Sequence, residues 1–431
     1  MGKLQPWTLR QQQLSNGVRV ASLHLPHVER PHVSLTLRGG PTLEDDDTWG
    51  LSHMVEHMVF RGTTSLPTSK DVALAFDEFG GDANAATYHN RLVFESRCDD
   101  GAIDATVQLF AEMLTQPVFE GFDVEKDIMR EELLETLDDN DEDIDVDNLL
   151  LERLFAGTPM ARNIEGPIDL LEDRTLDDVE RFHARLVHPE HTLVLAVGND
   201  VHDDVVQAAQ LHLSSWTPPV TPLEGTAPPN RLRAHLGGQA HDDVQTEVRL
   251  GFIAPGDIGP QREVLQLLVR VLDDGPSTRI PAHLVDEQGL AYSMWASSET
   301  FVDTGVFELG ADVHHKRVAD VVQAWCALLR DVCQHGVGDD ELARAKRRMR
   351  RDVIDAALDP EGIAESMQQP LLYGLPFDPH GMLQRAKNVT SDDIRTFAQG
   401  MCTAANARVA FVGRLTRKQK DLCKQALATL E

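Results

Sequence analysis

The sequence predicts an α+β fold of two homologous domains, each an antiparallel sheet with helices packed on one face. Three observations support this prediction. The chain has 431 residues, which is more than a single domain of about 150 residues usually contains. Segments in its two halves resemble each other at a separation of roughly 210 residues, too long for a solenoid repeat. A proline-rich stretch lies between the two halves.

The duplication is visible in the order of the predicted elements. In each half an alternating strand ends in a Gly/Pro turn and a charged loop, and an apolar-periodic helix follows. Two strand-like runs come next, and then an amphipathic helix. The paired segments are 33–63 with 248–278, 79–100 with 288–313, and 104–117 with 319–332; further strands are expected at 18–25, 191–199 and 407–415.

The stretch "SSWTPPVTPLEGTAPPN" (214–230) contains five prolines. Proline removes backbone donors and favours extended conformations, so this stretch predicts a semi-rigid linker. The expected boundaries are therefore 1–213 for the first domain and 231–431 for the second.

The composition fits an ordinary globular protein, with 42% hydrophobic and 26% charged residues. No stretch approaches the roughly 20 apolar residues that cross a bilayer, and the N-terminus has no apolar core typical of a signal peptide. The five cysteines form no CxxC pattern, which indicates reduced thiols. We therefore expect a cytoplasmic, bacterial protein without a membrane partner.

The formal net charge of −30 argues against a nucleic-acid partner, because phosphate binding needs clustered Lys and Arg. Two interpretations of the acidity remain open. One is solubility, and the other is attraction of basic peptides toward an acidic cavity. The densest acidic run, "LDDNDEDIDVDN" (137–148), predicts a solvated loop or the start of a helix.

The stretch "GLSHMVEHMVFRGT" (50–63) carries the strongest chemical signal. His53 and His57 are four residues apart, so on a helix both imidazoles point to one side and can bind one metal ion. Glu56 lies beside that face, where a carboxylate can act as general base toward a water molecule. The order His-x-x-Glu-His is the inverted zinc-peptidase motif. The alternative is a pair of core histidines that donate to carbonyl groups.

A catalytic zinc site has three protein ligands and an open position. The helical segment "DVEKDIMREELLETL" (123–137) offers four glutamates for the third ligand. Two of them are seven residues apart on one face, so one could bind the metal while the other accepts an imidazole N–H. The residue types alone do not choose among Glu125, Glu131, Glu132 and Glu135.

Three blocks of the sequence resemble the pitrilysin (insulysin) family of inverted-motif zinc peptidases, in particular the short chains that include mitochondrial processing peptidase and its bacterial relatives. The blocks are "GLSHMVEHMVFRGT" with "EFGGDANAATYHNRLVFE", "EKDIMREELLETLDDNDED", and "GPSTRIPAHLVDEQGLAYSMWASSETFVDTGVFELGAD". The resemblance implies that His53, His57 and Glu132 bind Zn²⁺ and that Glu125 supports them. It also implies that the strand in "DANAAT" (82–87) holds substrate by β-augmentation, with Asn84 and Ala85 near the scissile bond.

The resemblance includes one departure. Family members usually carry an Arg seven residues before the Tyr of the "GLAY" block, and this chain has Val285 there, before Tyr292. The Tyr292 hydroxyl could still donate to an oxyanion, or Tyr292 could be an ordinary buried aromatic residue. The missing Arg indicates that a homologous partner chain supplies a complete Arg/Tyr pair, in a heterodimer; a homodimer is the alternative.

The resulting prediction is a zinc-dependent endopeptidase that cleaves short or unfolded peptides with Glu56 as general base. The rival hypothesis is a catalytically silent scaffold subunit of the same fold. The zinc hypothesis would be excluded if the Glu132 carboxylate lay more than about 6 Å from both imidazoles, because a ligand bond is only about 2 Å long.

Overall fold

The structure is a computed structural model that describes residues 7–218, 220–223, 235–240, 245–259 and 261–430. The chain forms two compact units, each assembled from separate segments. The first unit contains residues 1–135, 162–227 and 354–377, and the second contains 136–161, 228–353 and 378–431. The predicted α+β class with two sheets is confirmed. Within the described ranges, no helix is long and apolar enough to span a membrane.

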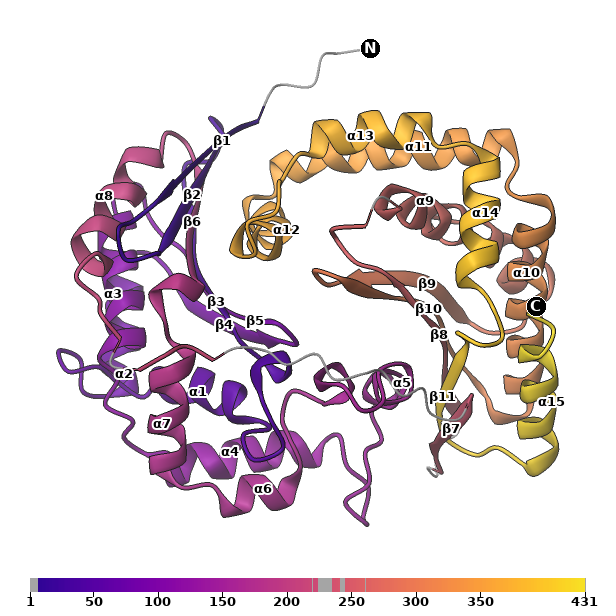
Figure 1. Ribbon diagram of the computed structural model, residues 1–431, viewed down its shortest axis with the longest axis horizontal. Helices are drawn as coiled ribbons and strands as arrows, with labels where there is room; N and C mark the ends of the chain where they lie inside the picture. Colours follow the sequence, from indigo (N-terminus) through magenta and orange to yellow (C-terminus); the bar gives the residue numbers. More distant parts are fainter. Residues whose placement is uncertain (1–6, 219, 224–234, 241–244, 260, 431) are drawn as a thin grey trace. The chain divides into compact units, whose positions relative to one another are not determined.

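The first unit is built on a six-stranded sheet with the order β1-β2-β6-β3-β5-β4 (Figure 1). Strands β2 and β6 are parallel, and the other neighbours are antiparallel. Because β4 is the last strand in this order, one of its edges has no neighbouring strand among the described residues. The strands are β1 Thr8–Gln13, β2 Arg19–His24, β3 His32–Arg38, β4 Ala83–Tyr88, β5 Arg91–Arg97 and β6 Thr192–Gly198.

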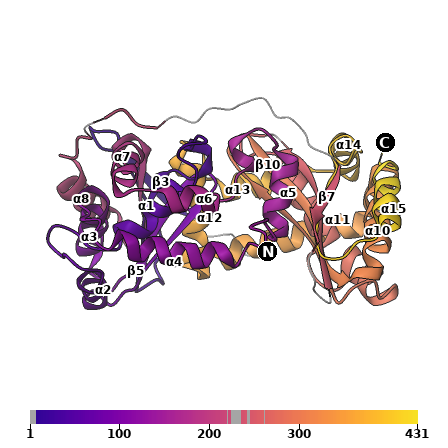
Figure 2. The same cartoon turned by 90° about the horizontal axis from the view of Figure 1, so that it is seen from below.

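Helices cover both faces of this sheet, whereas the sequence predicted helices on one face only. Helices α3 and α8 lie side by side against one face (Figure 1, Figure 2). Helix α12 packs on the opposite face, where its apolar residues meet Leu23, Leu193 and Leu195. Both central strands, β3 and β6, are therefore almost fully buried. The helices of this unit are α1 Leu51–Val59, α2 Ser69–Glu78, α3 Ile103–Thr115, α4 Phe122–Leu134, α6 Ile168–Asp173, α7 Leu176–Leu186, α8 His202–Leu213 and α12 Pro360–Leu372.

The second unit repeats this plan with five strands in the order β7-β11-β8-β10-β9. Strands β7 and β11 are parallel, as β2 and β6 are in the first sheet, and the remaining pairs are antiparallel. The strands are β7 Leu236–Gln239, β8 Gln245–Pro255, β9 Ser293–Thr300, β10 Thr304–His314 and β11 Arg408–Val412. The helices are α5 Val146–Leu154, α9 Arg262–Leu272, a π-helix at Ile280–Glu287, α10 Val318–His335, α11 Asp339–Asp355, α13 Pro379–Asn388, α14 Ser391–Met401 and α15 Arg417–Leu427.

The two units exchange one helix each, which the repeat pattern of the sequence did not predict. Helix α5 comes from the first half of the chain but packs on β8 and β11 of the second sheet. Helix α12 comes from the second half but belongs to the first unit. The domain boundaries at 213 and 231 stay a prediction, and residues 219 and 224–230 of the expected linker lie outside the described part of the chain.

The acidic run 137–148 is both a loop and the start of a helix. The Asp138 carboxylate accepts hydrogen bonds from the backbone of Asn140 and Glu142, and Asp145 caps the N-terminus of α5. These carboxylates satisfy backbone donors that a helix start and a tight turn leave unpaired.

Candidate metal centre and general base

Helix α1 is held at its N-terminus by the buried carboxylate of Glu44. Its two oxygens accept hydrogen bonds from the backbone N–H groups of Gly50 (2.9 Å) and Ser52 (2.8 Å), and Glu44 is only 3% exposed. Gly50 has φ 89°, and a Cβ atom there would lie 2.4 Å from the carbonyl oxygen of Glu165. A glycine is therefore required at this position. These constraints fix where the first turn of α1 points.

His53 and His57 lie on one side of α1, as their spacing predicts. Their Nε2 atoms are 3.1 Å apart and the two rings are perpendicular. Both side chains are largely buried, with exposed fractions of 13% and 16%. The alternative interpretation, in which both histidines donate to carbonyl groups, is not what the structure shows.

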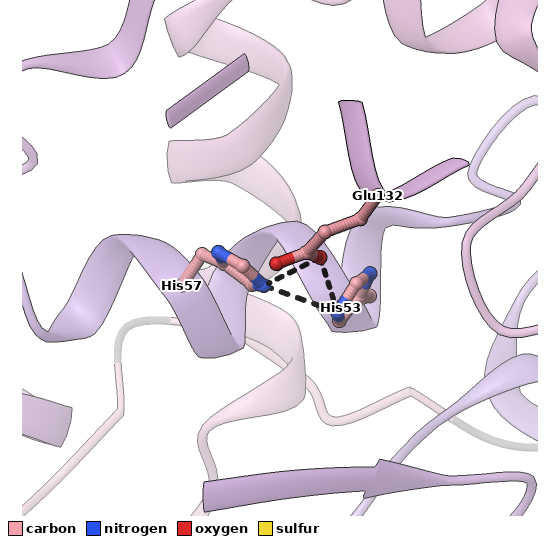
Figure 3. Close-up of side chains that lie close together, drawn as sticks. All are labelled: His53, His57 and Glu132. Carbon is pink, nitrogen blue, oxygen red and sulfur yellow. Dashed lines mark hydrogen bonds and ion pairs between the residues drawn. The ribbon is translucent and has the colours of Figure 1, made fainter. Parts of the chain in front are cut away.

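Glu132 comes to the two histidines from α4, which packs against α1. Its Oε2 atom is 3.5 Å from His57 Nε2 and 3.9 Å from His53 Nε2. Figure 3 shows the three side chains converging on one point. The separation is well below the limit of about 6 Å that would have excluded a common metal.

Glu125 lies two turns earlier on the same face of α4, as its spacing of seven from Glu132 predicts. Its Oε2 atom accepts a hydrogen bond from His57 Nδ1 (3.1 Å), and its Oε1 atom accepts one from Arg61 Nη1 (2.9 Å). Because Nδ1 of His57 carries the proton toward Glu125, Nε2 presents its lone pair toward His53 and Glu132. Of the remaining candidates, Glu131 is exposed beside Arg130, and Glu135 is the C-cap of α4.

The electrostatics of the cluster differ for its two imidazoles, because His53 is held neutral whereas the carboxylates around His57 favour its charged form. Burial and the neighbouring His57 lower the pKa of His53 to about 3. Burial alone would lower the pKa of His57, but the contact with Glu125 and the other nearby carboxylates outweigh it and raise that pKa. The hydrogen bond from His57 holds the pKa of Glu125 below its ordinary value.

The donor set fits a zinc ion. Two imidazole nitrogens and one carboxylate oxygen lie within 4.8 Å of one another, and this N,N,O set is one that catalytic zinc sites use. Glu132 is 47% exposed, so the side of the cluster away from α1 is open. Among the described residues, this is the one cluster of three or more His, Cys, Asp or Glu side chains that could share a metal.

Glu56 lies on α1 between the two histidines and is partly buried. Its Oε2 atom accepts a hydrogen bond from Thr87 Oγ1 on strand β4 (2.9 Å). Burial raises the pKa of Glu56 above its ordinary value. The sequence-predicted residues Asn84 and Ala85 lie on the same edge strand, in register with Glu95 and Phe94 of β5.

The residues predicted from the "GLAY" block belong to the second unit. Tyr292 is 96% exposed, so the interpretation of Tyr292 as a buried aromatic residue is wrong. Val285 packs against the core of its unit. Arg279, the nearest arginine in the sequence, pairs with Glu341 (2.8 Å) and Asp331 (3.0 Å), so it is not available to replace the missing Arg.

Three supporting residues were not predicted from the sequence: Thr87, Arg61 and Glu44. The roles of Arg61 and Thr87 cannot be inferred from residue spacing, because their partners Glu125 and Glu56 lie on other elements. Glu44 could have been suspected, since an acidic side chain shortly before a helix often caps it.

Comparisons with known proteins bear on the family of this chain. The family model described as Insulinase (Peptidase family M16) matches residues 19–168, and the model described as Peptidase M16 inactive domain matches residues 173–349. An uncharacterized zinc protease of Mycobacterium leprae (strain TN) is 28% identical over 89% of this chain and 87% of that protein. A probable mitochondrial-processing peptidase subunit beta of Schizosaccharomyces pombe is 24% identical over 93% of this chain and 90% of that protein.

A solved structure shows the same fold. The crystal structure of a protease from Helicobacter pylori has a TM-score of 0.85 and 21% identity, with 95% of this chain and 100% of that chain covered. Together with the two family models, which between them span residues 19–349, this likeness covers both units. The chain belongs to peptidase family M16, the insulinase or pitrilysin family.

Proposed function

We propose that this chain is a zinc-dependent endopeptidase that cleaves short or unfolded peptides. The observation that carries the proposal is the convergence of His53, His57 and Glu132, with the partly buried Glu56 on the same turn of α1. His53, His57 and Glu132 would hold the metal, and Glu125 would orient His57.

The chemistry divides between the metal and the side chains. A zinc ion bound here supplies a Lewis acid that polarises a carbonyl group and makes water more acidic. Glu56 takes a proton from the attacking water and later gives it to the leaving amine. Its raised pKa favours both steps, because a base whose pKa is closer to neutral also serves better as the acid that follows.

Substrate would bind along the free edge of β4. Main-chain hydrogen bonds to an edge strand accept many side-chain sequences, which suits a peptidase of broad specificity. Asn84 and Ala85 would lie next to the scissile bond. The formal charge of −30 would draw basic peptides toward the protein at low ionic strength.

A homologous partner chain would complete the site. Val285 can neither donate a hydrogen bond nor carry charge, and the guanidinium of Arg279 is already paired with two carboxylates. We therefore propose a heterodimer in which the partner contributes an Arg/Tyr pair. Co-purification from the native source should recover a homologous chain of similar size, and a purified chain that is fully active alone would exclude this part of the proposal.

The test of the main proposal uses protein purified without added zinc. Metal analysis should find about one zinc per chain, a chelator should abolish hydrolysis of an unfolded peptide, and added zinc should restore it. Glu56→Gln should keep the zinc but lose hydrolysis by at least about 100-fold, the typical contribution of a general base. A silent scaffold would instead show no chelator-sensitive hydrolysis, either alone or with its partner.

A further inference from the structure

Strand β4 is linked to the proposed general base through one side chain. Thr87 Oγ1 donates a hydrogen bond to Glu56 Oε2 at 2.9 Å. Thr87 lies on the edge strand proposed to receive substrate, whereas Glu56 lies on α1. In the described part of the chain, no other side chain is seen to hydrogen bond to the Glu56 carboxylate.

The geometry of β4 explains why the contact is well defined. Side chains two apart on a strand share a face, so Ala83, Ala85 and Thr87 all point toward α1. The two alanines leave space on that face, and Thr87 is the polar residue in the row. Its β-branched side chain has few rotamers, and its backbone is fixed by the pairing of Thr87 with Leu92 of β5. The position of the Thr87 hydroxyl is therefore set by the strand and by the side-chain rotamer, and not by its contact with Glu56.

When one oxygen of a carboxylate is fixed by a hydrogen bond, the other oxygen remains free to take up a proton. With Oε2 bonded to Thr87, the rotation of the Glu56 carboxyl group is restricted and Oε1 is presented for proton transfer. Misplacement of a reacting group by about 1 Å can lower a rate by about 100-fold, so such a restraint has a measurable effect.

We propose that Thr87 is a positioning residue that orients the Glu56 carboxylate and joins the strand that receives substrate to the base that acts on it. This inference rests on the proposed function, since it assigns Thr87 a role in the same reaction. It goes beyond that function because nothing in the zinc-binding cluster requires a hydroxyl on β4.

The test compares Thr87→Val with Thr87→Ser in the full chain and, where a partner is recovered, in the complex. Thr87→Val keeps the shape of the side chain but removes the donor, so kcat should fall about 10- to 100-fold with KM within about twofold. Thr87→Ser keeps the donor and should stay within about threefold of wild type. Zinc content and melting temperature should match wild type in both variants.

A second comparison excludes a purely structural effect. Thr36→Val makes the same exchange on β3, where the Thr36 hydroxyl is buried and has no hydrogen-bond partner, and it should leave kcat unchanged. In the Glu56→Gln background, Thr87→Val should cause no further loss of kcat, because the group that it positions is already missing. The affinity of Glu56→Gln for a fluorescent peptide, measured by anisotropy, should also be unaffected by Thr87→Val.

The outcomes separate this inference from the proposed function. If Glu56→Gln is fully active, both are wrong. If Glu56→Gln is inactive but Thr87→Val keeps the kcat of wild type, only the role of Thr87 is wrong. Equal losses of kcat in Thr87→Val and Thr87→Ser would also overturn the role of Thr87, since the effect would then come from packing. A loss of zinc in Thr87→Val would overturn it as well, since the effect would then come from the metal.

Discussion

Helices α1 and α9 occupy the same place in two copies of one fold, but the side chains at their equivalent positions differ in polarity. Each follows the central strand of its sheet through a Gly/Pro turn. When segments 33–63 and 248–278 are aligned residue for residue, His53, Glu56 and His57 correspond to Leu268, Val271 and Leu272. The three apolar residues are 0 to 2% exposed and belong to the core of the second unit.

This difference shows what the fold itself requires. An apolar stripe on this helix is enough to build the unit, as α9 demonstrates. In α1 the turn that bears the motif instead carries partly buried polar groups, and burial of such groups is unfavourable without partners. In the first unit Glu125 is the partner of His57 and Thr87 is the partner of Glu56, while Arg61 pairs with Glu125. The candidate metal centre is thus a local replacement of apolar residues on a duplicated scaffold, as expected where a site is built at some cost in stability.

The largest expected effect comes from making α1 resemble α9. The triple variant His53→Leu, Glu56→Val and His57→Leu should remove zinc binding and lower hydrolysis by at least about 10⁴-fold, because it deletes both the metal and the base. Zinc at 1,000 times its dissociation constant stabilises a folded protein by about 4 kcal/mol. Added zinc should therefore raise the melting temperature of wild type but not that of the variant. If the triple variant still bound one zinc with wild-type affinity, the metal site would have to lie elsewhere in the chain.

A smaller effect is expected from the residue that orients His57. Glu125→Gln removes the charge that fixes the Nδ1 proton of His57, so zinc affinity should fall about 10- to 100-fold. Competition with a chromophoric chelator measures this affinity. Glu131→Gln is the matched control on the same helix, because Glu131 is 78% exposed and lies outside the cluster. Equal affinities for the two variants would contradict the supporting role of Glu125.

The two units should also differ in their response to acid. Burial lowers the pKa of both His89 and His191, in the first unit, to about 4. The unfolded chain binds protons at these groups below pH 6.5, whereas the folded unit binds them only near pH 4. The free energy of unfolding therefore falls as pH decreases from 6.5 to 4, by about 1 kcal/mol for each histidine over the first pH unit. His283 and His335 of the second unit are exposed.

Native-state hydrogen exchange at pH 7.5 and 5.5, corrected for intrinsic exchange rates, measures this difference. Peptides from β6 should lose protection on acidification more than peptides from β10. His191→Gln should reduce the loss in β6, and His283→Gln should not change it. Equal losses in the two sheets would show that the buried histidines do not set the acid response.

Much of this architecture could be predicted from the sequence, because it depends on local patterns. The strands at 18–25, 191–199 and 407–415 appear as β2, β6 and β11. The spacing of four puts His53 and His57 on one side of α1, and the spacing of seven puts Glu125 and Glu132 on one face of α4. Local periodicity fixes which residues share a face of an element, and the resemblance to the family chose Glu132 among four glutamates.

What could not be predicted depends on contacts between distant segments. The exchange of α5 and α12 is invisible to a pattern search, because an amphipathic helix does not indicate which sheet will cover its apolar face. Thr87 and Arg61 reach their partners across 31 and 64 residues of chain. The exposure of Tyr292 was also left open, since an aromatic residue beside a glycine loop fits either a core or a surface position.

The smallest expected effect concerns that tyrosine. Tyr292 is 96% exposed, so Tyr292→Phe should change the free energy of unfolding by less than about 0.5 kcal/mol. An oxyanion donor is worth about 100-fold or more only in a preorganised site shielded from water. A solvated hydroxyl with Val285 in place of the Arg lacks that environment, so kcat of the isolated chain should fall by no more than about tenfold. Steady-state kinetics of the isolated chain with a zinc-matched wild-type control measure this. A loss above 100-fold would mean that the chain's own Tyr292 completes the site, and the need for a partner's Arg/Tyr pair would disappear.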